Sequence, residues 1–286
     1  MIVSKKPWQE GTVKGHVERH YDELDALYRE VWGEHLHHGY WVRGDETVEE
    51  AVVALLEQVA LRAQPLEGKT VCDVGCGYGG TARWLATHYG AEVTGLTLSP
   101  AQYRYALEQP LPSPAPRYFV QDWLTNNLPD ASFDVVTALE STEHIPDLES
   151  CFAQAYRVLR PGGRFVICAW LAAEAPKPWE VRHLLEPICR EGRLAQLGSL
   201  SEYRNALERA GFIVTDTRDV TRQVRRTWTV IIGRVLRSLM TRRDYWSYLL
   251  DPNKRERVFA LSLLRMALAY RSGALHYALL SAERPR

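Results

Sequence analysis

A glycine-rich segment is the first feature of the sequence that could do chemistry. It reads Asp73-Val-Gly-Cys-Gly-Tyr-Gly-Gly80 and follows a short run of β-forming residues. Glycines let the backbone turn tightly and approach a ligand, and the amide groups of a following helix then face an anionic group. Gly75, Gly77 and Gly80 also satisfy the G-x-G-x-x-G pattern of dinucleotide-binding loops, so the loop alone does not identify its ligand.

The acidic residues around this loop discriminate between the two ligand classes. A dinucleotide site places an acid about 20 residues further on, at the end of the second strand. The sequence has Thr97 and Leu98 there and no acid. Asp73 would repel a pyrophosphate but suits the ammonium group of a methionine moiety. We therefore expect S-adenosylmethionine, with a ligand-free βα turn as the alternative, and the predicted contacts here are Asp73, Gly75, Cys76, Gly77, Gly79, Thr97 and Leu98.

Asp122 and Trp123 follow another predicted strand, at residues 117–121. A carboxylate can accept a hydrogen bond from the exocyclic amine of adenine, and an aromatic plane can pack on the ring. We expect these two side chains to bind the adenine. The alternative is a solvated aspartate beside a tryptophan of the core.

Glu140, Glu143 and His144 follow the predicted strand at residues 133–139. Offsets of three and four place them on one face of a short turn, which Pro146 ends. Histidine is the side chain best suited to take a proton near neutral pH, and a neighbouring carboxylate can orient it. We predict all three as catalytic, with His144 as general base and Glu140 also touching the cofactor. The alternative is that His144 only shapes the pocket.

The histidine-rich segment at residues 35–38 suggests a metal site at first sight. Adjacent histidines point in different directions on most backbones, and no cysteine or carboxylate cluster completes a coordination shell. We therefore expect no metal. The segment is better explained as part of a flap over the cofactor and the acceptor, formed by Tyr21, His38, Gly39 and Tyr40. For Tyr21, which would contact the cofactor, a place in the core is the alternative.

Aromatic residues are frequent in the second half of the chain. They usually pack the core, but they also line clefts for apolar or cationic groups. We expect Trp170, Trp228 and Tyr245 to line an acceptor pocket, together with His38 and Tyr40. Arginines cluster between residues 222 and 243, where a solvated face is the ordinary explanation and an acidic or membrane-surface partner is the alternative.

The elements that must position these residues alternate between strand and helix. This alternation predicts an α/β fold with a Rossmann-like, mainly parallel sheet and helices on both faces. A helix beginning at Thr47 carries a capping box with Glu50, and Ser99-Pro100 begins another. The seven predicted strands are 69–74, 91–97, 117–121, 133–139, 164–170, 212–220 and 274–281.

Helical segments interrupt this rhythm after Trp170. Residues 176–198 and 226–270 have helical patterns broken by prolines, and a helix at residues 201–210 ends at Gly211. Helices inserted between late strands predict a cap over the sheet edge where ligands bind. The expected organisation is a helical flap at 1–46, a cofactor-binding core at 47–175, and cap insertions with the final strands at 176–286.

Composition limits the partners and the compartment. The chain has 35 basic and 35 acidic residues, so its formal net charge is zero and its composition shows no electrostatic footprint of nucleic-acid binding. No secretory signal and no run of about 20 apolar residues is present. Five scattered cysteines without a C-x-x-C pair indicate reduced thiols. We expect a cytoplasmic protein with no integral membrane segment, a small-molecule acceptor and an oligomeric state that the sequence does not reveal.

Beyond the glycine loop, several motifs resemble those of class I methyltransferases, in the same order. These are Asp122, Leu128-Pro-Asp-Ala-Ser-Phe-Asp134 and Leu159-Arg-Pro-Gly-Gly163. Other stretches resemble the γ-tocopherol methyltransferase-like group. They are His20-Tyr-Asp22, Val31-Trp-Gly-Glu-His-Leu-His-His-Gly-Tyr-Trp41, Leu139-Glu-Ser-Thr-Glu-His-Ile-Pro-Asp147, Thr227-Trp228 and Ala269-Tyr-Arg-Ser-Gly-Ala-Leu-His-Tyr277.

This resemblance implies the cofactor S-adenosylmethionine and a small-molecule acceptor. One departure concerns the ribose, because Thr97 replaces the acid commonly found at the end of the second strand. Similar bacterial members share the Thr-Leu-Ser-Pro pattern, which implies that Thr97 and Gln102 hold the ribose.

Three functional hypotheses follow. The first is methyl transfer to carbon or oxygen of a largely apolar small molecule, such as a prenylated phenol or a terpenoid-like metabolite. The second is N-methylation of a small amine or methylation of a lipid alkene. The third is a cofactor-binding protein without catalytic activity.

Overall fold

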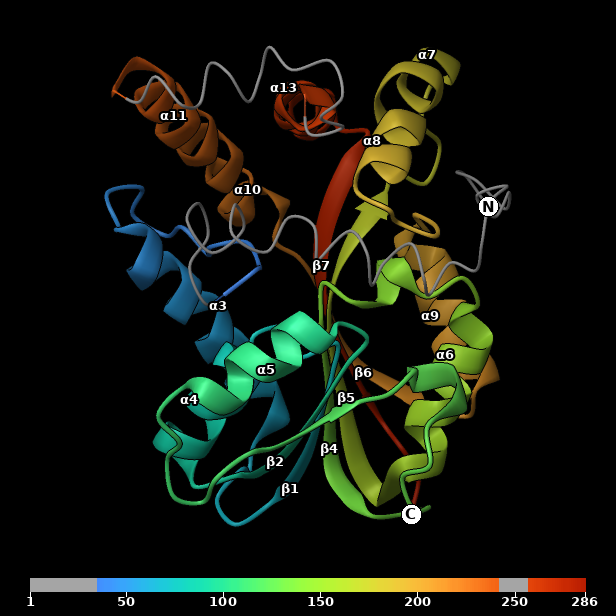
Figure 1. The fold of residues 1–286 in the computed structure, drawn as a ribbon. Coiled ribbons are helices and arrows are strands. Elements are labelled where there is room, and N and C mark those ends of the chain that lie inside the picture. Colours follow the sequence, from blue (N-terminus) through green and yellow to red (C-terminus); the bar gives the residue numbers. More distant parts are fainter. Residues whose placement is uncertain (1–34, 242–256) are drawn as a thin grey trace.

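The computed structural model describes residues 35–241 and 257–286, and its centre is a seven-stranded sheet (Figure 1). The strand order is β3-β2-β1-β4-β5-β7-β6, and only β7 runs antiparallel to its neighbours. This confirms the predicted mainly parallel, Rossmann-like sheet. The strands are β1 (Thr70–Val74), β2 (Glu92–Thr97), β3 (Arg117–Val120), β4 (Phe133–Leu139), β5 (Leu159–Ala172), β6 (Ile213–Asp219) and β7 (Leu275–Glu283).

Helices cover both faces of the sheet, as Figure 1 shows. One face carries α3 (Val48–Ala63), α4 (Gly80–Tyr89) and α5 (Pro100–Glu108). The other carries α6 (Leu148–Val158) and α9 (Leu200–Arg209). Buried apolar side chains form one cluster on each side of the sheet, because each strand contributes alternate residues to the two faces. All strands except β7 run in one direction, so their carboxyl ends lie at one edge of the sheet.

Local capping explains where several helices begin and end. The Thr47 side chain accepts a hydrogen bond from the backbone N–H of Glu50, whose carboxylate accepts one from the backbone N–H of Thr47, so the predicted capping box forms. Ser99 caps α5 with Pro100 in the first turn, as expected. Gly90 ends α4 in the left-handed region, with φ of 61°. The boundaries at Thr47 and Ser99 are those predicted from the sequence.

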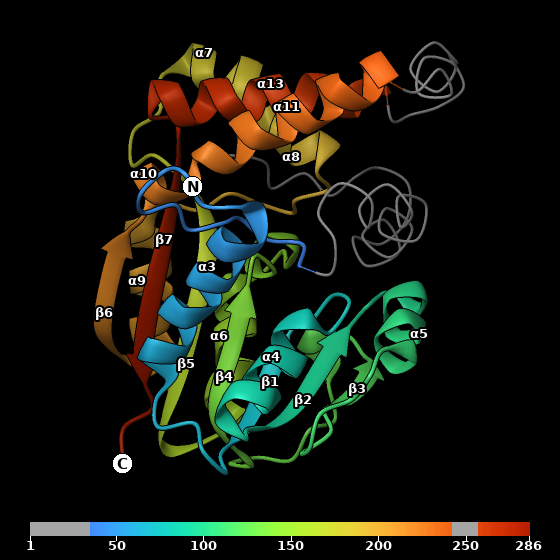
Figure 2. The ribbon, with the colours of Figure 1, turned by 90° about the vertical axis from the view of Figure 1, so that its left-hand side faces the viewer.

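The remaining helices lie beyond the carboxyl ends of the strands and form a cap (Figure 2). α7 (Pro178–Glu180), the π-helical turn η3 (Val181–Leu185) and α8 (Glu186–Glu191) follow β5. α10 (Thr221–Val224), α11 (Arg226–Thr241) and α13 (Arg257–Ser272) lie between β6 and β7. In Figure 2 α11 and α13 lie side by side across the top of the molecule, and they pack against each other.

Two predicted boundaries were wrong. The helix expected over residues 176–198 ends at Glu191, and the chain from Gly192 to Gly198 has no helical turn. β5 begins at Leu159 and not after the glycine turn, because Leu159 pairs with Phe133 before the register shifts. Gly162, with φ of 78°, keeps the expected turn geometry within that longer strand.

Several predictions concern residues outside the described parts of the chain. Most of the proposed flap at 1–46 lies there, as do Tyr21 and Tyr245. The described portion of that flap, residues 35–46, contains no helix. None of the helices in the described ranges is both long enough and apolar enough to cross a membrane.

Candidate active site

The glycine loop connects β1 to α4 at the carboxyl edge of the sheet. Gly75, Gly77 and Gly79 all have positive φ, at 73°, 54° and 75°. A side chain at Gly75 would meet Ser141 Cβ at 2.5 Å, so this glycine lets two strand ends approach. A Cβ at Gly77 would meet no atom within 4 Å, and the residue lines two cavities. The loop therefore leaves room for a ligand against its backbone.

Asp73 lies buried at the end of β1, under this loop. Its Oδ1 accepts a hydrogen bond from Thr137 Oγ1 at 3.1 Å, while its Oδ2 is buried without a partner among the described residues. Burial raises the pKa of Asp73 to about 7, although the Thr137 hydrogen bond opposes the rise. A buried carboxylate oxygen without a donor fits an incoming ammonium group, as expected for the methionine end of the cofactor.

The histidine-rich segment lies beside Asp73. In the part of the chain that the structure describes, His35 Nδ1 and His37 Nε2 are also buried without a partner, and both residues line the small cavity that Asp73 lines. Burial lowers the pKa of His35 to about 3 and also lowers that of His37. These rings are therefore neutral near pH 7 and can exchange hydrogen bonds with the polar end of a ligand. The residues described by the structure contain no group of three or more side chains arranged to hold a metal.

A larger cavity extends from the loop along the ends of β2 and β4, and we call it the cofactor cavity. Most of the predicted cofactor contacts that lie within the described residues line this cavity. The exceptions are Asp73 and Cys76, which line the adjoining small cavity, and Gly79, which lines neither cavity. Its lining comprises Leu36, Val74, Gly75, Gly77, Leu96, Thr97, Leu98, Ser99, Gln102, Gln121, Asp122, Trp123, Leu139, Glu140, Ser141, His144 and Ile145.

The ribose position predicted at Thr97 and Gln102 has a defined hydrogen-bond pattern. Thr97 Oγ1 donates to Gln102 Oε1 at 2.8 Å and accepts from the Ser99 backbone N–H at 3.1 Å. Both side chains are buried. Thr97 therefore fixes the carboxamide of Gln102, and the amide NH₂ of Gln102 is the group available to donate to a hydroxyl.

Asp122 and Trp123 also have local partners. Asp122 caps a short 3-10 turn by accepting the Leu124 backbone N–H at 3.0 Å. Trp123 is buried, and its Nε1–H donates to the Cys151 carbonyl at 2.9 Å. The backbone turn and the indole bond hold both side chains at the wall of the cofactor cavity, where they were expected.

Glu140 is the most heavily hydrogen-bonded side chain of the site. Its carboxylate accepts hydrogen bonds at 2.7–2.9 Å from four donors, the His38 backbone N–H and Nδ1–H, Trp170 Nε1–H and the Tyr277 hydroxyl. Burial disfavours the charged form, but the electrostatic effect of His38 and its hydrogen bonds outweigh that cost and lower the pKa of Glu140 to about 2. Glu140, at φ of 50°, is thus a fixed anion.

His38 extends this network into the cap. Its Nε2 accepts the Trp228 indole N–H at 2.7 Å, and the Tyr270 hydroxyl lies 3.2 Å from the same atom. An indole nitrogen can only donate, so the lone pair of His38 is on Nε2 and its proton is on Nδ1, facing Glu140. The network thereby joins β4 to α11 and α13 through one buried imidazole.

Glu143 and His144 have different environments although they are adjacent. Glu143 is buried and accepts the Trp170 backbone N–H, and burial raises its pKa to about 8. His144 is partly buried, and its Nδ1 lies 3.1 Å from the Arg193 carbonyl. A carbonyl only accepts, so His144 carries its proton on Nδ1 and a lone pair on Nε2. Burial lowers the pKa of His144, while the hydrogen bond to the Arg193 carbonyl and, to a lesser extent, Glu140 oppose that shift.

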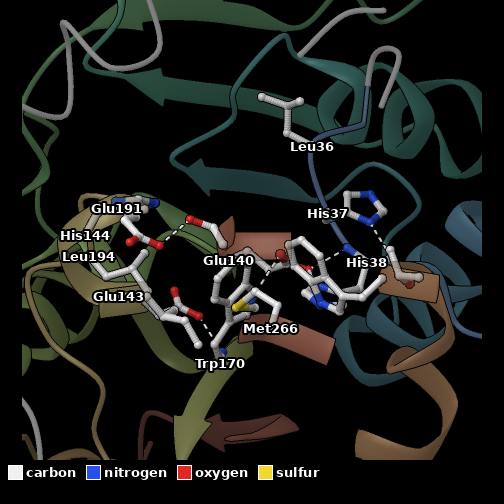
Figure 3. Close-up of a pocket in the computed structure, with 15 residues that line it drawn as sticks. Leu36, His37, His38, Glu140, Glu143, His144, Trp170, Glu191, Leu194 and Met266 are labelled. Carbon is white, nitrogen blue, oxygen red and sulfur yellow. Dashed lines mark hydrogen bonds and ion pairs between the residues drawn. The ribbon is translucent and has the colours of Figure 1, made fainter. Parts of the chain in front are cut away.

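Another cavity lies under the cap, and we call it the acceptor cavity (Figure 3). Leu36, Glu140 and His144 line both this cavity and the cofactor cavity. The two spaces therefore adjoin at these three side chains. The rest of its lining comprises His37, His38, Glu143, Trp170, Ile188, Glu191, Gly192, Leu194, Thr227, Trp228, Ser262 and Met266.

Some predicted site residues lie elsewhere. Tyr40, expected to contact the acceptor, is instead packed in the core beside α3, where its backbone N–H donates to the Ala51 carbonyl. Cys76, by contrast, lines the small cavity with Asp73; it also packs against Gly95, and burial raises its pKa well above the ordinary value. Sequence reasoning missed lining residues from α8 and α13, namely Ile188, Glu191 and Met266, because nothing in their local pattern distinguishes them from packing residues.

Comparisons with known proteins agree with this geometry. The profile of the methyltransferase domain matches residues 72–167. The chloroplastic tocopherol O-methyltransferase of Arabidopsis thaliana is 32% identical over 287 residues, covering 93% of this chain and 80% of that protein. The 27-O-demethylrifamycin SV methyltransferase of Amycolatopsis mediterranei (strain S699) is 36% identical over 213 residues, covering 73% of this chain and 78% of that protein.

Solved structures show the same fold. The mycolic acid cyclopropane synthase CmaA1, complexed with SAH and CTAB, superposes with a TM-score of 0.84 and covers 98% of this chain and 100% of its own. At 20% identity this likeness concerns the fold alone. The identity to the tocopherol enzyme extends over nearly the whole chain. The chain therefore belongs to the S-adenosylmethionine-dependent methyltransferases, in the tocopherol methyltransferase-like group.

Proposed function

We propose that the enzyme methylates a carbon or oxygen atom of a largely apolar small molecule, such as a prenylated phenol or a terpenoid-like metabolite. The observation that carries this proposal is that the cofactor and acceptor cavities adjoin at Leu36, Glu140 and His144. Methyl transfer is an in-line displacement at the sulfonium, so a nucleophile and a donor must meet at one point. S-adenosylmethionine supplies the methyl group when it is bound.

The chemistry of the acceptor cavity supports an apolar substrate. Ile188, Leu194 and Met266 contribute aliphatic surface, and Trp170 and Trp228 contribute aromatic faces. The polar groups of this wall are largely engaged with one another, since Glu140, His38 and both indole rings are hydrogen-bonded within the network. Apolar walls with few oriented polar groups are typical of sites for small apolar ligands. The tocopherol enzyme among the relatives is consistent with such a substrate.

His144 is the residue we assign as general base for a phenol or alcohol. Its pKa is below the ordinary value because of burial, so the ring is neutral near pH 7. The Arg193 carbonyl orients the ring and directs the Nε2 lone pair as the proton acceptor. Glu140 is the carboxylate that favours the protonated ring after transfer, whereas the Glu143 carboxylate binds the backbone of Trp170. We therefore propose the electrostatic role for Glu140 and not for Glu143.

The cofactor contacts follow from the same layout. Asp73 Oδ2 and the neighbouring imidazole nitrogens suit the methionine group, the Gln102 amide suits the ribose, and Asp122 with Trp123 suits the adenine. Tyr21 and Tyr245, as cofactor and acceptor contacts, remain predictions outside the described residues, and the cytoplasmic location remains a prediction as well.

Two measurements test this proposal. Calorimetric titration with S-adenosylhomocysteine tests the cofactor site, and absence of binding would contradict it. His144→Ala is expected to lower kcat by about 10²–10³-fold, the usual contribution of a general base. In the unaltered enzyme, the acid limb of the pH profile of kcat should lie below pH 6.5, because the pKa of His144 is lowered from that value.

The role of His144 as a general base determines the sign of the pH effect on activity. A base must be unprotonated, so activity is present above the lowered pKa and is lost as pH falls through it. The acid limb should disappear in His144→Ala. Turnover that stays unchanged at saturating acceptor over this pH range would remove His144 from the mechanism. Incubation of labelled cofactor with phenols, terpenoids and amines, followed by mass spectrometry, then identifies the acceptor class.

A further inference from the structure

A further cavity of distinct chemistry shares no lining residue with the cofactor cavity or the acceptor cavity. It is formed by the turn at residues 41–44, the α10–α11 junction and the end of α13. Five arginines line it, and they come from all three of these segments. They are Arg43, Arg222, Arg225, Arg226 and Arg271. We call it the basic cavity.

Among the described residues, the positive charge of this cavity has little counter-charge. Arg43 pairs with Asp45 at 3.0 Å, but Arg222, Arg225, Arg226 and Arg271 form no ion pair within the described ranges. Glu46, another nearby acid, accepts hydrogen bonds at 2.6–2.8 Å from the backbone N–H groups of residues 42–44. The chain as a whole has no net charge, so this concentration of cations is local.

The framework under these arginines is well defined. The guanidinium of Arg226 lies over the Trp41 ring at 5.5 Å, a cation–π contact. Trp41 is buried, its backbone N–H donates to the Gln223 carbonyl at 3.0 Å, and its Nε1–H donates to Thr227 Oγ1 at 3.0 Å. The guanidinium groups of the three segments repel one another. Holding them close together on a fixed framework therefore costs free energy unless an anion is present.

We propose that the basic cavity binds a phosphate group, either of a soluble phosphorylated compound or of a lipid headgroup. Guanidinium groups bind phosphate oxygens through paired, charge-assisted hydrogen bonds, and several of them together match a doubly charged anion. The cavity receives arginines from segments far apart in the chain, which a simple solvated helix face does not require. This site is separate from the methyl-transfer site and does not depend on the acceptor proposed above.

The basic cavity also shares a wall with the acceptor cavity. Tyr270 lines the basic cavity, and its hydroxyl contacts His38 Nε2, which faces the other side. Thr227, a lining residue of the acceptor cavity, accepts the Trp41 indole hydrogen bond. A bound phosphate group would therefore hold the 41–44 turn against α11 and steady the wall that carries His38.

Pyrophosphate is the first probe, measured by calorimetry and by thermal unfolding of the full chain. We expect saturable binding and a rise in Tm with concentration, since a ligand of the folded state stabilises it. Arg225→Gln with Arg271→Gln should weaken binding by at least about tenfold, because each lost guanidinium removes charge-assisted hydrogen bonds. Both side chains are exposed and form no ion pair with any described residue, so the variant should fold.

Arg204→Gln with Arg218→Gln is the matched control. These arginines are also exposed and lie on α9 and β6, outside the basic cavity. This variant removes the same charge and should bind pyrophosphate like the unaltered protein. Equal weakening in both double variants, or absence of both pyrophosphate and vesicle binding in the unaltered protein, would overturn the proposal.

Vesicles distinguish the two sources of phosphate. Cosedimentation is measured with phosphatidylcholine vesicles, with and without about one third phosphatidic acid, a fraction chosen to give a strongly anionic surface. Binding only to the anionic vesicles, lost in the Arg225/Arg271 variant and competed by pyrophosphate, assigns the site to a lipid headgroup. Pyrophosphate binding without vesicle binding assigns it to a soluble phosphate. Vesicle binding that the Arg225/Arg271 variant retains would contradict the site.

Discussion

The cofactor cavity and the acceptor cavity adjoin, yet they are built in different ways. The cofactor cavity is made of short loops at the carboxyl ends of β1, β2, β3 and β4, where backbone conformation dominates. The acceptor cavity is made of side chains from α8, α11, α13 and the segment around His38. The cofactor cavity therefore depends on the local geometry of turns, whereas the acceptor cavity depends on contacts between distant parts of the chain.

The sequence separations of the hydrogen bonds express this difference. At the cofactor cavity Thr97 bonds Gln102, five residues away, and Asp122 bonds Leu124, two residues away. In the network at the acceptor cavity, Glu140 bonds His38 over 102 residues and His38 bonds Trp228 over 190 residues. Local bonds form with the turn itself, whereas the long-range network requires the sheet and the cap to be assembled first.

The largest effect is expected from Gly77→Val. Gly77 has φ of 54° and faces open space, so a valine would combine strain in the left-handed region with a side chain inside the ligand cavity. We expect affinity for S-adenosylhomocysteine to fall by at least about 100-fold, the change of some 3 kcal/mol that a blocked contact surface produces. Calorimetric titration measures it.

Gly90→Val is the matched control for Gly77. Gly90 also has positive φ, at 61°, and a Cβ there would also meet no atom within 4 Å, but this glycine lies at the far end of α4. The variant should show the strain of about 1–2 kcal/mol in unfolding without loss of cofactor affinity. Equal loss of affinity in both variants would mean that the loop acts through stability and not as the wall of the site.

Glu140→Gln should affect both cavities at once. A carboxamide keeps the size but loses the charge, and its NH₂ would face the donors that now converge on the carboxylate. We expect kcat/KM to fall by about 100-fold and the free energy of unfolding by about 3 kcal/mol, as for other broken buried charge networks. Steady-state kinetics and denaturant unfolding measure the two effects.

A different buried carboxylate separates these effects. Glu180 is 4% exposed and caps α7 by accepting the Lys177 backbone N–H at 2.8 Å, away from both cavities. Glu180→Gln should cost about 1 kcal/mol of stability, as for a lost cap, and should leave kcat/KM unchanged. If Glu140→Gln likewise lowers the free energy of unfolding but leaves kcat/KM unchanged, Glu140 has only a structural role. The two adjoining cavities are then not coupled through it.

The fold was largely predictable because its determinants are local. Thr47, Ser99 and Gly90 mark helix ends through caps that need only neighbouring residues. The prediction failed where tertiary pairing decides the outcome. β5 begins at Leu159 because Phe133 pairs with it, and the helix after Trp170 stops at Glu191 although the residues that follow have a helical pattern.

The candidate site was likewise predictable from the sequence only in part. Asp73, Gln102 and Asp122 lie at the cavities expected from motif and spacing. Tyr40 was assigned to the acceptor from its place beside His38, but the local sequence does not show which side of the segment is buried, and Tyr40 packs against the core. Spacing likewise does not reveal that Glu143 is directed toward the Trp170 backbone while Glu140 receives four donors.

The last comparison concerns the pH dependence of stability and contrasts these two carboxylates. The pKa of Glu140 is lowered from 4.5 to about 2, so its contribution is present above pH 4.5 and is lost as pH falls through 2. The pKa of Glu143 is raised from 4.5 to about 8, so its contribution is full below pH 4.5 and is lost as pH rises through 8. The signs are opposite although the residues are three positions apart.

Glu143→Gln should therefore flatten the decline in stability between pH 5 and pH 8, because an amide cannot ionise. Relative to the variant, the free energy of unfolding of the unaltered enzyme should fall between pH 5 and pH 8. The expected fall is on the order of 1.4 kcal/mol for each pH unit that lies between the unfolded and the folded pKa of Glu143. Urea unfolding at pH 5, 6.5 and 8 measures the difference. Parallel curves for the two proteins would mean that Glu143 is ionised at neutral pH, and the two neighbouring carboxylates would then have similar environments.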